Sequence, residues 1–200
     1  MSYAIIGFGK IGQALAKAFA RSGIEVSVAT TREPESFAAA AAAIGPGIIP
    51  KRLPEAVKAD IVFLAVRFES HRDVAKAQPS WRGKTIIDAM NTLDDPAEAL
   101  SGLPSSAFVA KAFPGARLVK GFNHLPAQTL AADPKGTGGR RVVFLSSNDE
   151  GAAAQVAALA RQLGFAPVNL GKLDEGGTLV QARGKSWAPL VFQDLFKQEP

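Results

Sequence analysis

Short apolar runs alternate along this chain with stretches in which apolar residues recur at helical spacing. The runs at residues 4–6, 25–29, 61–66, 85–90, 117–121 and 142–146 predict six strands. These strands are apolar at nearly every position, which is typical of a parallel sheet covered on both faces. The pattern therefore predicts an α/β fold of the Rossmann type, a doubly wound and mainly parallel sheet with helices on both faces.

Helical spacing begins after residue 12 and stops at Gly23, and it recurs at about residues 35–44, 54–59, 69–77, 105–113 and 151–163. No repeat or linker divides these elements, so we expect a single domain over residues 1–200, with residues 171–200 as a C-terminal extension. Two hundred residues are enough for one α/β domain but few for a nucleotide domain plus a separate substrate domain. That length disfavours dehydrogenases that complete their substrate site with a second domain.

A glycine motif, GFGKIG at residues 7–12, follows the first strand and opens the first helix. Gly7 allows a tight turn, Gly9 lets the backbone approach a pyrophosphate, and Gly12 lets the helix pack closely on the strand. The N–H groups and the dipole at the helix N-terminus favour bound phosphates. Glycines also mark ordinary turns, but the strand–helix–strand context favours a dinucleotide-binding site.

The residues after the second strand, Thr30, Thr31 and Arg32, predict which dinucleotide binds. An NAD site needs a carboxylate about 20 residues past the glycine motif, whereas an NADP site must accept a 2′-phosphate. Arg32 stands at that offset, and a guanidinium fits phosphate oxygens. Glu33 follows directly and leaves the NAD alternative open. The sequence favours NADP.

The composition of the chain disfavours several classes of protein and of binding site. The chain has no cysteine, and therefore no disulfide framework, thiol nucleophile or iron–sulfur ligand set. The net charge of +5 and a pI near 9.6 come from scattered residues, which disfavours nucleic acid as a partner. The chain enters a strand at once and contains no long apolar run, so we expect a soluble cytoplasmic protein without membrane contact. Its two histidines lack metal-ligand spacing, and we expect no metal site.

Ligands of open α/β sheets bind outside the carboxyl ends of the strands, which nominates the residues that follow each strand. Arg67 and Phe68 follow the strand at 61–66, Asn91 and Thr92 the strand at 85–90, and residues 122–126 the strand at 117–121. For Asn91 and Asn123 a cap or turn role is as good an interpretation as ligand contact.

Several of these segments together resemble one family. They are residues 7–12 (GFGKIG), 30–32 (TTR), 64–66 (LAV), 87–91 (IDAMN) and 119–127 (VKGFNHLPA), with weaker likeness at 164–173 and 177–196. The chain resembles the NADPH-dependent F-420 reductase-like family, whose archaeal relatives pass hydride between NADP and the deazaflavin coenzyme F-420. It is also similar to the nucleotide domain of the six-transmembrane metalloreductases.

The resemblance implies that the glycine loop holds the pyrophosphate, that residues 30–32 hold the 2′-phosphate, and that residues after strands 61–66, 85–90 and 117–121 surround the nicotinamide. The cofactor-binding residues so implied are Gly7, Phe8, Gly9, Lys10, Ile11, Gly12, Thr30, Thr31, Arg32, Ala65, Val66, Arg67, Ala89, Met90, Asn91 and Asn123. The chain departs from the family where Pro-Trp is replaced by Arg67-Phe68, Thr-Asn-Pro by residues 90–92, and Thr by His124. All three departures lie on the acceptor side.

These observations predict an oxidoreductase that transfers hydride between NADP(H) and a flavin or deazaflavin, with F-420, FMN or FAD as the partner. The alternatives are an NADPH-binding regulatory module without turnover, or a reductase of a small carbonyl or imine. Asn123 and His124 are the catalytic candidates, and His124 supplies a proton or else only packs beneath the loop. His71 is expected to be solvated. The apolar tail at residues 186–196 packs on its own sheet, shields the acceptor or joins a homodimer, which the resemblance favours.

Overall fold

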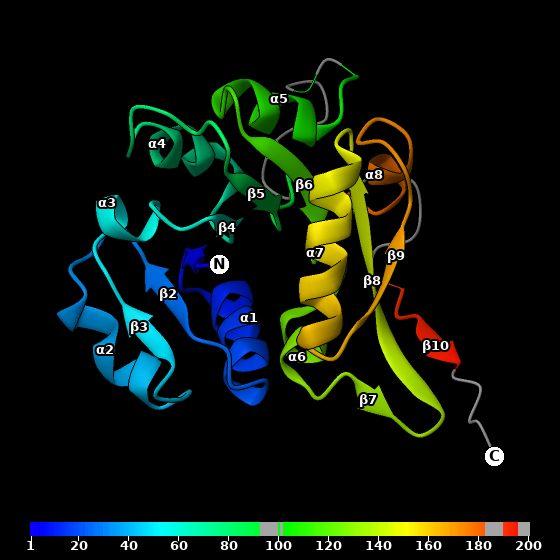
Figure 1. Cartoon of the computed structure of the whole chain (residues 1–200), viewed down its shortest axis with the longest axis horizontal. Coiled ribbons are helices and arrows are strands. Elements are labelled where there is room, and N and C mark those ends of the chain that lie inside the picture. Colours follow the sequence, from blue (N-terminus) through cyan, green and yellow to red (C-terminus); the bar gives the residue numbers. More distant parts are fainter. Residues whose placement is uncertain (93–99, 101, 183–189, 196–200) are drawn as a thin grey trace.

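The computed structural model describes residues 1–92, 100, 102–182 and 190–195 (Figure 1). Six strands are parallel and lie in the order β3-β2-β1-β4-β5-β6. Their bounds are β1 Tyr3–Ile6, β2 Val26–Ala29, β3 Ile48–Pro50, β4 Ile61–Leu64, β5 Thr85–Asp88 and β6 Arg117–Gly121. This order reverses between β1 and β4, so the predicted Rossmann-type fold is confirmed.

The end of the sheet beyond β6 is mixed. β8 (Gly139–Ser147) runs antiparallel to β6, and β9 (Ala166–Asn169) runs parallel to β8. β7 (Lys135–Gly136) and β10 (Gln193–Leu195) both pair antiparallel with β8. The tail therefore packs on its own sheet as far as residues 190–195 show, and Phe192 contacts Phe144 with 5.1 Å between ring centroids. Residues 186–189 and 196 of that predicted segment lie outside the described residues.

Helices cover both faces of the sheet (Figure 1). Their bounds are α1 Lys10–Arg21, α2 Glu35–Ala42, α3 Leu53–Ala56, η1 Phe68–Ser70, α4 His71–Ala75, α5 Ser105–Ala112, α6 Ala127–Ala131, α7 Glu150–Gln162 and α8 Gly176–Leu179. Side chains of α1, α2, α6 and α7 form one core, and those of α3, α4 and α5 form the other. Alternate strand residues serve the two cores: Ile5 and Phe63 face the first, and Ile6 and Leu64 the second.

The short elements escaped prediction. β3, β7, β10, α6 and α8 have two to five residues each, too few for a period to be recognised. β3 is the edge strand next to β2, and its last residue is Pro50. The strands predicted at 61–66 and 85–90 end two residues early, at Leu64 and Asp88, because the chain there turns into loops at the carboxyl edge.

None of the helices in the described ranges is both long enough and apolar enough to cross a membrane.

Candidate functional site

The glycine loop lies at the point where the strand order reverses, between the carboxyl ends of β1 and β4. Gly7 has a φ of +100°, and a Cβ there would lie 2.2 Å from the Ala65 carbonyl oxygen. A Cβ on Gly12 would lie 1.9 Å from the Gly7 carbonyl oxygen. Only glycine fits at these two positions, as the sequence predicted. A Cβ on Gly9, by contrast, would have no atom within 4 Å, so the backbone there is open to a ligand.

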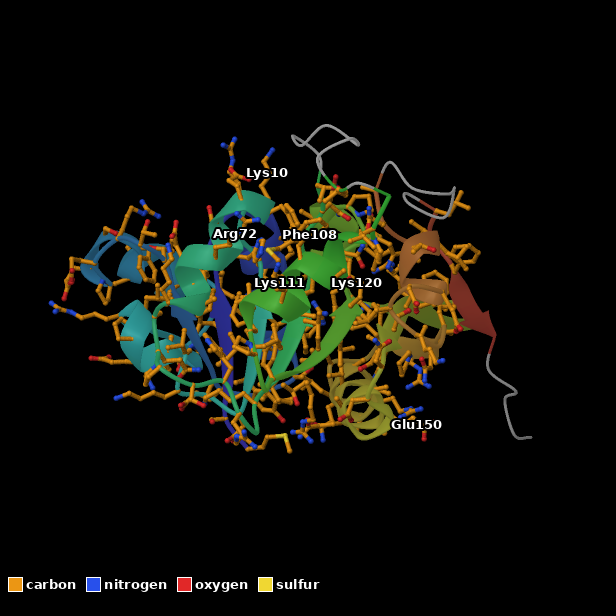
Figure 2. The ribbon with its side chains drawn as sticks, turned by 90° about the horizontal axis from the view of Figure 1, so that it is seen from above. Lys10, Arg72, Phe108, Lys111, Lys120 and Glu150 are labelled. Atoms are coloured by element: carbon orange, nitrogen blue, oxygen red, sulfur yellow. The ribbon has the colours of Figure 1, made fainter. Side chains whose placement is uncertain are left out.

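The helix that follows presents its first N–H groups beside this open backbone. Gly9 caps α1 without a side-chain hydrogen bond, and no acidic residue stands in the first turn. The loop itself is held by Gln13, whose Nε2 donates to the Phe8 carbonyl oxygen at 3.1 Å. Lys10, at the beginning of α1, is exposed, and Figure 2 shows it extending outward from the ribbon. The loop thus offers backbone donors and a cation to an anionic group.

Two cavities meet at this loop. One has a volume of about 430 Å³ and the other about 270 Å³. The first is lined by Ile6, Gly7, Phe8, Gly9, Thr30, Thr31, Arg32, Leu53, Ala65, Val66, Arg67, Ser70, Asp73 and Val74. The second is lined by Gly9, Lys10, Ile11, Ala65, Val66, Arg67, Phe68, Glu69, Ala89, Met90 and Asn91. All but two of the residues predicted to bind the cofactor line one cavity or both, the exceptions being Gly12, which packs α1 on β1, and Asn123.

The turn after β2 has a defined internal structure. The Arg32 backbone N–H donates to Thr30 Oγ1 at 3.0 Å, so the Thr30 hydroxyl shapes the turn. Arg32 itself is exposed at the cavity. Glu33, the alternative ribose-binding acid, is engaged elsewhere: its Oε2 lies 3.0 Å from Arg52 Nη2. Glu33 does not line the cavity, and this geometry favours the 2′-phosphate interpretation over the ribose-binding acid.

A third, larger hollow of about 970 Å³ lies between α4 and α5. Figure 2 shows Arg72 on α4 near Phe108 and Lys111 on α5, and these three residues line it. None of the residues predicted from the sequence lines it. It is separate from the carboxyl edge at the strand reversal, so we assign it no part in the candidate site.

Asn91 and Asn123 contact each other across the carboxyl ends of β5 and β6. Asn91 Nδ2 donates to the Asn123 carbonyl oxygen at 2.7 Å, and Asn123 Nδ2 donates to Asn91 Oδ1 at 3.2 Å. Both amides also bind the segment after α8: Asn123 Nδ2 donates to the Val180 carbonyl oxygen at 2.9 Å, and Asn91 Oδ1 accepts from the Ala182 N–H at 3.2 Å. These side chains therefore hold the C-terminal segment against the sheet.

Residue 122 supports this arrangement. Phe122 has a φ of +63°, a conformation that bulky side chains rarely adopt. Its fully buried ring lies between Phe63 and Phe165, at centroid distances of 5.5 and 5.9 Å. This packing maintains the strained backbone that turns Asn123 toward Asn91.

His124 is 2% exposed, and its ring lies 4.8 Å from that of Phe144. Burial lowers the pKa of His124 to about 4, an effect that the nearby Val142 backbone only partly offsets. Neither ring nitrogen has a hydrogen-bond partner of good geometry among the described residues. The imidazole is therefore neutral near pH 7 and lines neither cavity, which favours the packing role over the proton donor. His71 corrects the expectation of a solvated side chain: it is 1% exposed and packs against Phe68.

Sequence reasoning missed a buried ion pair directly beneath this edge. Lys120 Nζ lies 3.1 Å from Asp88 Oδ2 and donates to the Met90 carbonyl oxygen at 2.6 Å. Both side chains are 1% exposed or less, and Ser106 and the Met90 N–H also bind the Asp88 carboxylate. The pair joins β5 to β6 at the register Asp88–Lys120. The signal that could have found it was a charge of opposite sign at the fourth position of each strand, Asp88 in β5 and Lys120 in β6.

No group of three or more potential metal ligands occurs in the described part of the chain.

The fold and the glycine loop define a dinucleotide-binding domain of the Rossmann class. Residues 2–92 match the family described as NADP oxidoreductase, coenzyme F420-dependent. This match covers a little under half of the chain, and together with the fold it supports an NADP-binding oxidoreductase domain.

Several proteins are similar to this chain. A hypothetical protein, SMa0349 from Sinorhizobium meliloti, is 41% identical, with a TM-score of 0.92 over 97% of this chain and 96% of that one. A candidate F420-dependent NADP-reductase from Arthrobacter sp. FB24 is 27% identical, with a TM-score of 0.69 over 86% of each chain. Metalloreductase STEAP2 of Mus musculus is 36% identical over 118 residues, 58% of this chain and 23% of that protein.

The chain spans about a quarter to a third of the length of the curated metalloreductases that it matches. A reductive aminase from Aspergillus terreus is 21% identical, with a TM-score of 0.63 over 88% of this chain and 56% of that one. At that identity the likeness concerns the fold alone.

Proposed function

We propose that this protein transfers hydride from NADPH to a flavin or deazaflavin acceptor. The observation that carries the proposal is the pair of cavities that meet at Gly9, Ala65, Val66 and Arg67, on the carboxyl edge where the strand order reverses. One cavity supports an adenosine 2′-phosphate site and the other a nicotinamide site. The family that residues 2–92 match and the candidate F420-dependent reductase similar to the chain support the class of acceptor.

The residues at the first cavity fit NADP. The open backbone at Gly9 and the uncapped N-terminus of α1 suit a pyrophosphate, which needs close approach and N–H donors. Arg32, with Thr31 beside it, would hold the 2′-phosphate, and Thr30 would keep their turn in shape. Glu33 does not line this cavity, which supports NADP over NAD.

The second cavity supports orientation rather than acid–base catalysis. The ionisable side chains that line it, among the described residues, are Lys10, Arg67 and Glu69. NADPH, when bound, supplies a hydride, and an oxidised flavin takes it up together with one proton from solvent. Such a transfer needs two aligned rings and little proton chemistry from the protein. Ala65, Val66, Ala89, Met90 and Asn91 would form the wall that fixes the nicotinamide ring.

Anaerobic NADPH oxidation, with F-420, FMN and FAD offered in turn and NADH as the control donor, tests the proposal. We expect rapid oxidation of NADPH with at least one acceptor and slow oxidation of NADH. Tight NADPH binding without turnover on any acceptor would instead favour a regulatory module. If these three acceptors give no turnover and a small carbonyl or imine, offered next, does, the other alternative would be favoured.

The Gly9→Ala variant separates binding from folding. Its Cβ would meet no protein atom within 4 Å, so the fold should keep its stability. The methyl group would lie where the pyrophosphate approaches, and we expect NADPH binding to weaken by about tenfold or more. Calorimetric titration together with thermal unfolding measures both quantities.

We further propose that the protein forms a homodimer, as the resemblance implies, and that it is cytoplasmic. Light scattering on the full chain tests the dimer.

A further inference from the structure

We propose that Arg67 recognises a phosphate group on the acceptor, so that the protein uses a phosphorylated flavin or deazaflavin rather than an uncharged one. This inference rests on the proposed function and names the class of acceptor that the site takes. It concerns a residue that lines both cavities of the candidate site.

Arg67 lies at the border of the two cavities. It follows β4 directly, and together with Gly9, Ala65 and Val66 it lines both cavities. Its backbone is fixed, because the Ser70 N–H donates to the Arg67 carbonyl oxygen at 3.0 Å and Arg67 caps η1 in an extended conformation. The Arg67 backbone therefore holds a fixed place on the rim where an acceptor would enter, and the guanidinium reaches out from it.

The guanidinium is also available for a ligand. Its side chain is 76% exposed, and its one charged partner among the described residues is Glu69, at 3.6 Å. Glu69 is itself more than half exposed, and an ion pair in such a setting contributes little. A guanidinium has five N–H donors in a planar fork, which matches the oxygens of a phosphate. A phosphate could replace Glu69 at small cost.

The phosphates of the cofactor have other partners in the proposed arrangement. Gly9 and the N-terminus of α1 face the pyrophosphate, and Arg32 serves the 2′-phosphate in the larger cavity. Arg67 also lines the smaller cavity, together with Lys10. In that cavity the two cations face a single carboxylate, that of Glu69. The excess positive charge beside the nicotinamide site favours an anionic acceptor.

FMN and riboflavin separate this idea from general flavin binding, because they share the reacting ring and differ in one phosphate. We would measure KM and kcat for both acceptors with the wild-type protein, with Arg67→Gln and with the control Arg161→Gln. Arg161 is an exposed arginine of α7, on neither cavity. We expect Arg67→Gln to raise the KM for FMN by about tenfold, the effect of losing one hydrogen-bonded charge, and to leave riboflavin unchanged. Arg67→Lys should retain part of the preference.

Fluorescence titration of FMN and riboflavin into the protein without cofactor gives a second readout, independent of turnover. If no acceptor is reduced, the proposed function fails, while phosphate-dependent FMN binding that Arg67→Gln removes would still support the role of Arg67. Equal effects of Arg67→Gln on FMN and riboflavin would overturn the inference. So would a loss of NADPH affinity in Arg67→Gln, since it would assign Arg67 to the cofactor.

Discussion

The two halves of the carboxyl edge are built in opposite ways. Around β1 and β2 the edge consists of backbone and glycine: at Gly9 a Cβ would touch nothing, and the exposed Arg32 is left for a ligand. Around β5 and β6 it consists of side chains that bind one another, the buried Asp88 with the buried Lys120 and the half-buried Asn91 with Asn123. The polar groups of the first half are free to bind a ligand, whereas those of the second half bind one another and stabilise the fold. Substitutions should therefore impair binding in the first half and folding in the second.

Lys120→Met tests the second half most severely. It leaves the Asp88 carboxylate buried without its cation, and losing one partner of a buried ion pair costs about 3–5 kcal/mol. Urea denaturation should show that loss in the free energy of unfolding. The double variant Lys120→Met/Asp88→Leu should recover most of it, because no charge is then left unpaired. A single variant as stable as the wild type would show that water reaches the pair.

Acidification should destabilise the protein through His124. Its pKa is about 4 in the folded state against 6.5 when unfolded, so the unfolded state binds the proton more readily. The contribution of the neutral imidazole to the free energy of unfolding is therefore complete above pH 6.5 and is lost as the pH falls toward 4. At 1.36 kcal/mol per pKa unit, this loss amounts to about 3 kcal/mol.

Unfolding free energies between pH 7 and 4, for the wild type and for His124→Phe, measure this difference. We expect the slope over that interval to shrink in the variant. Hydrogen bonds from Ser2 lower the pKa of Asp60 below its ordinary value of 3.8. Asp60 therefore affects the unfolding free energy mainly below pH 4, outside the measured interval. Identical slopes would mean that the imidazole is solvated.

Arg32→Ala tests the first half. It removes a charged donor set from the 2′-phosphate and should weaken NADPH binding by about 2 kcal/mol, with little change for NADH. The free energy of unfolding should stay the same, because the side chain is exposed. Calorimetric titrations of both cofactors provide the ratio, and equal losses for the two would contradict the assignment.

Asn123→Ala should lower the free energy of unfolding by about 1–2 kcal/mol, less than Lys120→Met, since it leaves the Val180 carbonyl oxygen without its donor. Because the C-terminal segment then loosens at the acceptor side, turnover should fall more than NADPH affinity. Stopped-flow reduction and equilibrium binding on the same variant separate the two. Unchanged turnover would restrict Asn123 to a structural role.

The sequence predicted the β1–β2 half of the carboxyl edge better than the β5–β6 half. The glycine loop could be predicted because Gly7 and Gly12 stand where a Cβ would overlap a carbonyl oxygen, a requirement that residue type and spacing reveal. The role of Asn123 was left open, since an amide that binds Val180, 57 residues away, looks in the sequence like one that caps a turn. The solvation of His71 was predicted wrongly because its neighbours in sequence are polar, while in the fold its ring is buried and packs against Phe68.

The edge strand β3 bears on the behaviour of the protein in solution. The Lys51 N–H bonds inward to the Val28 carbonyl oxygen, so the alternation of a strand turns the nitrogen of Pro50 outward, along the free edge. A proline nitrogen carries no hydrogen to offer a passing strand. Pro50 thus hinders β-pairing between this edge of the sheet and other molecules. The three residues of β3 therefore complete the nucleotide-binding half of the sheet and also protect its edge from aggregation.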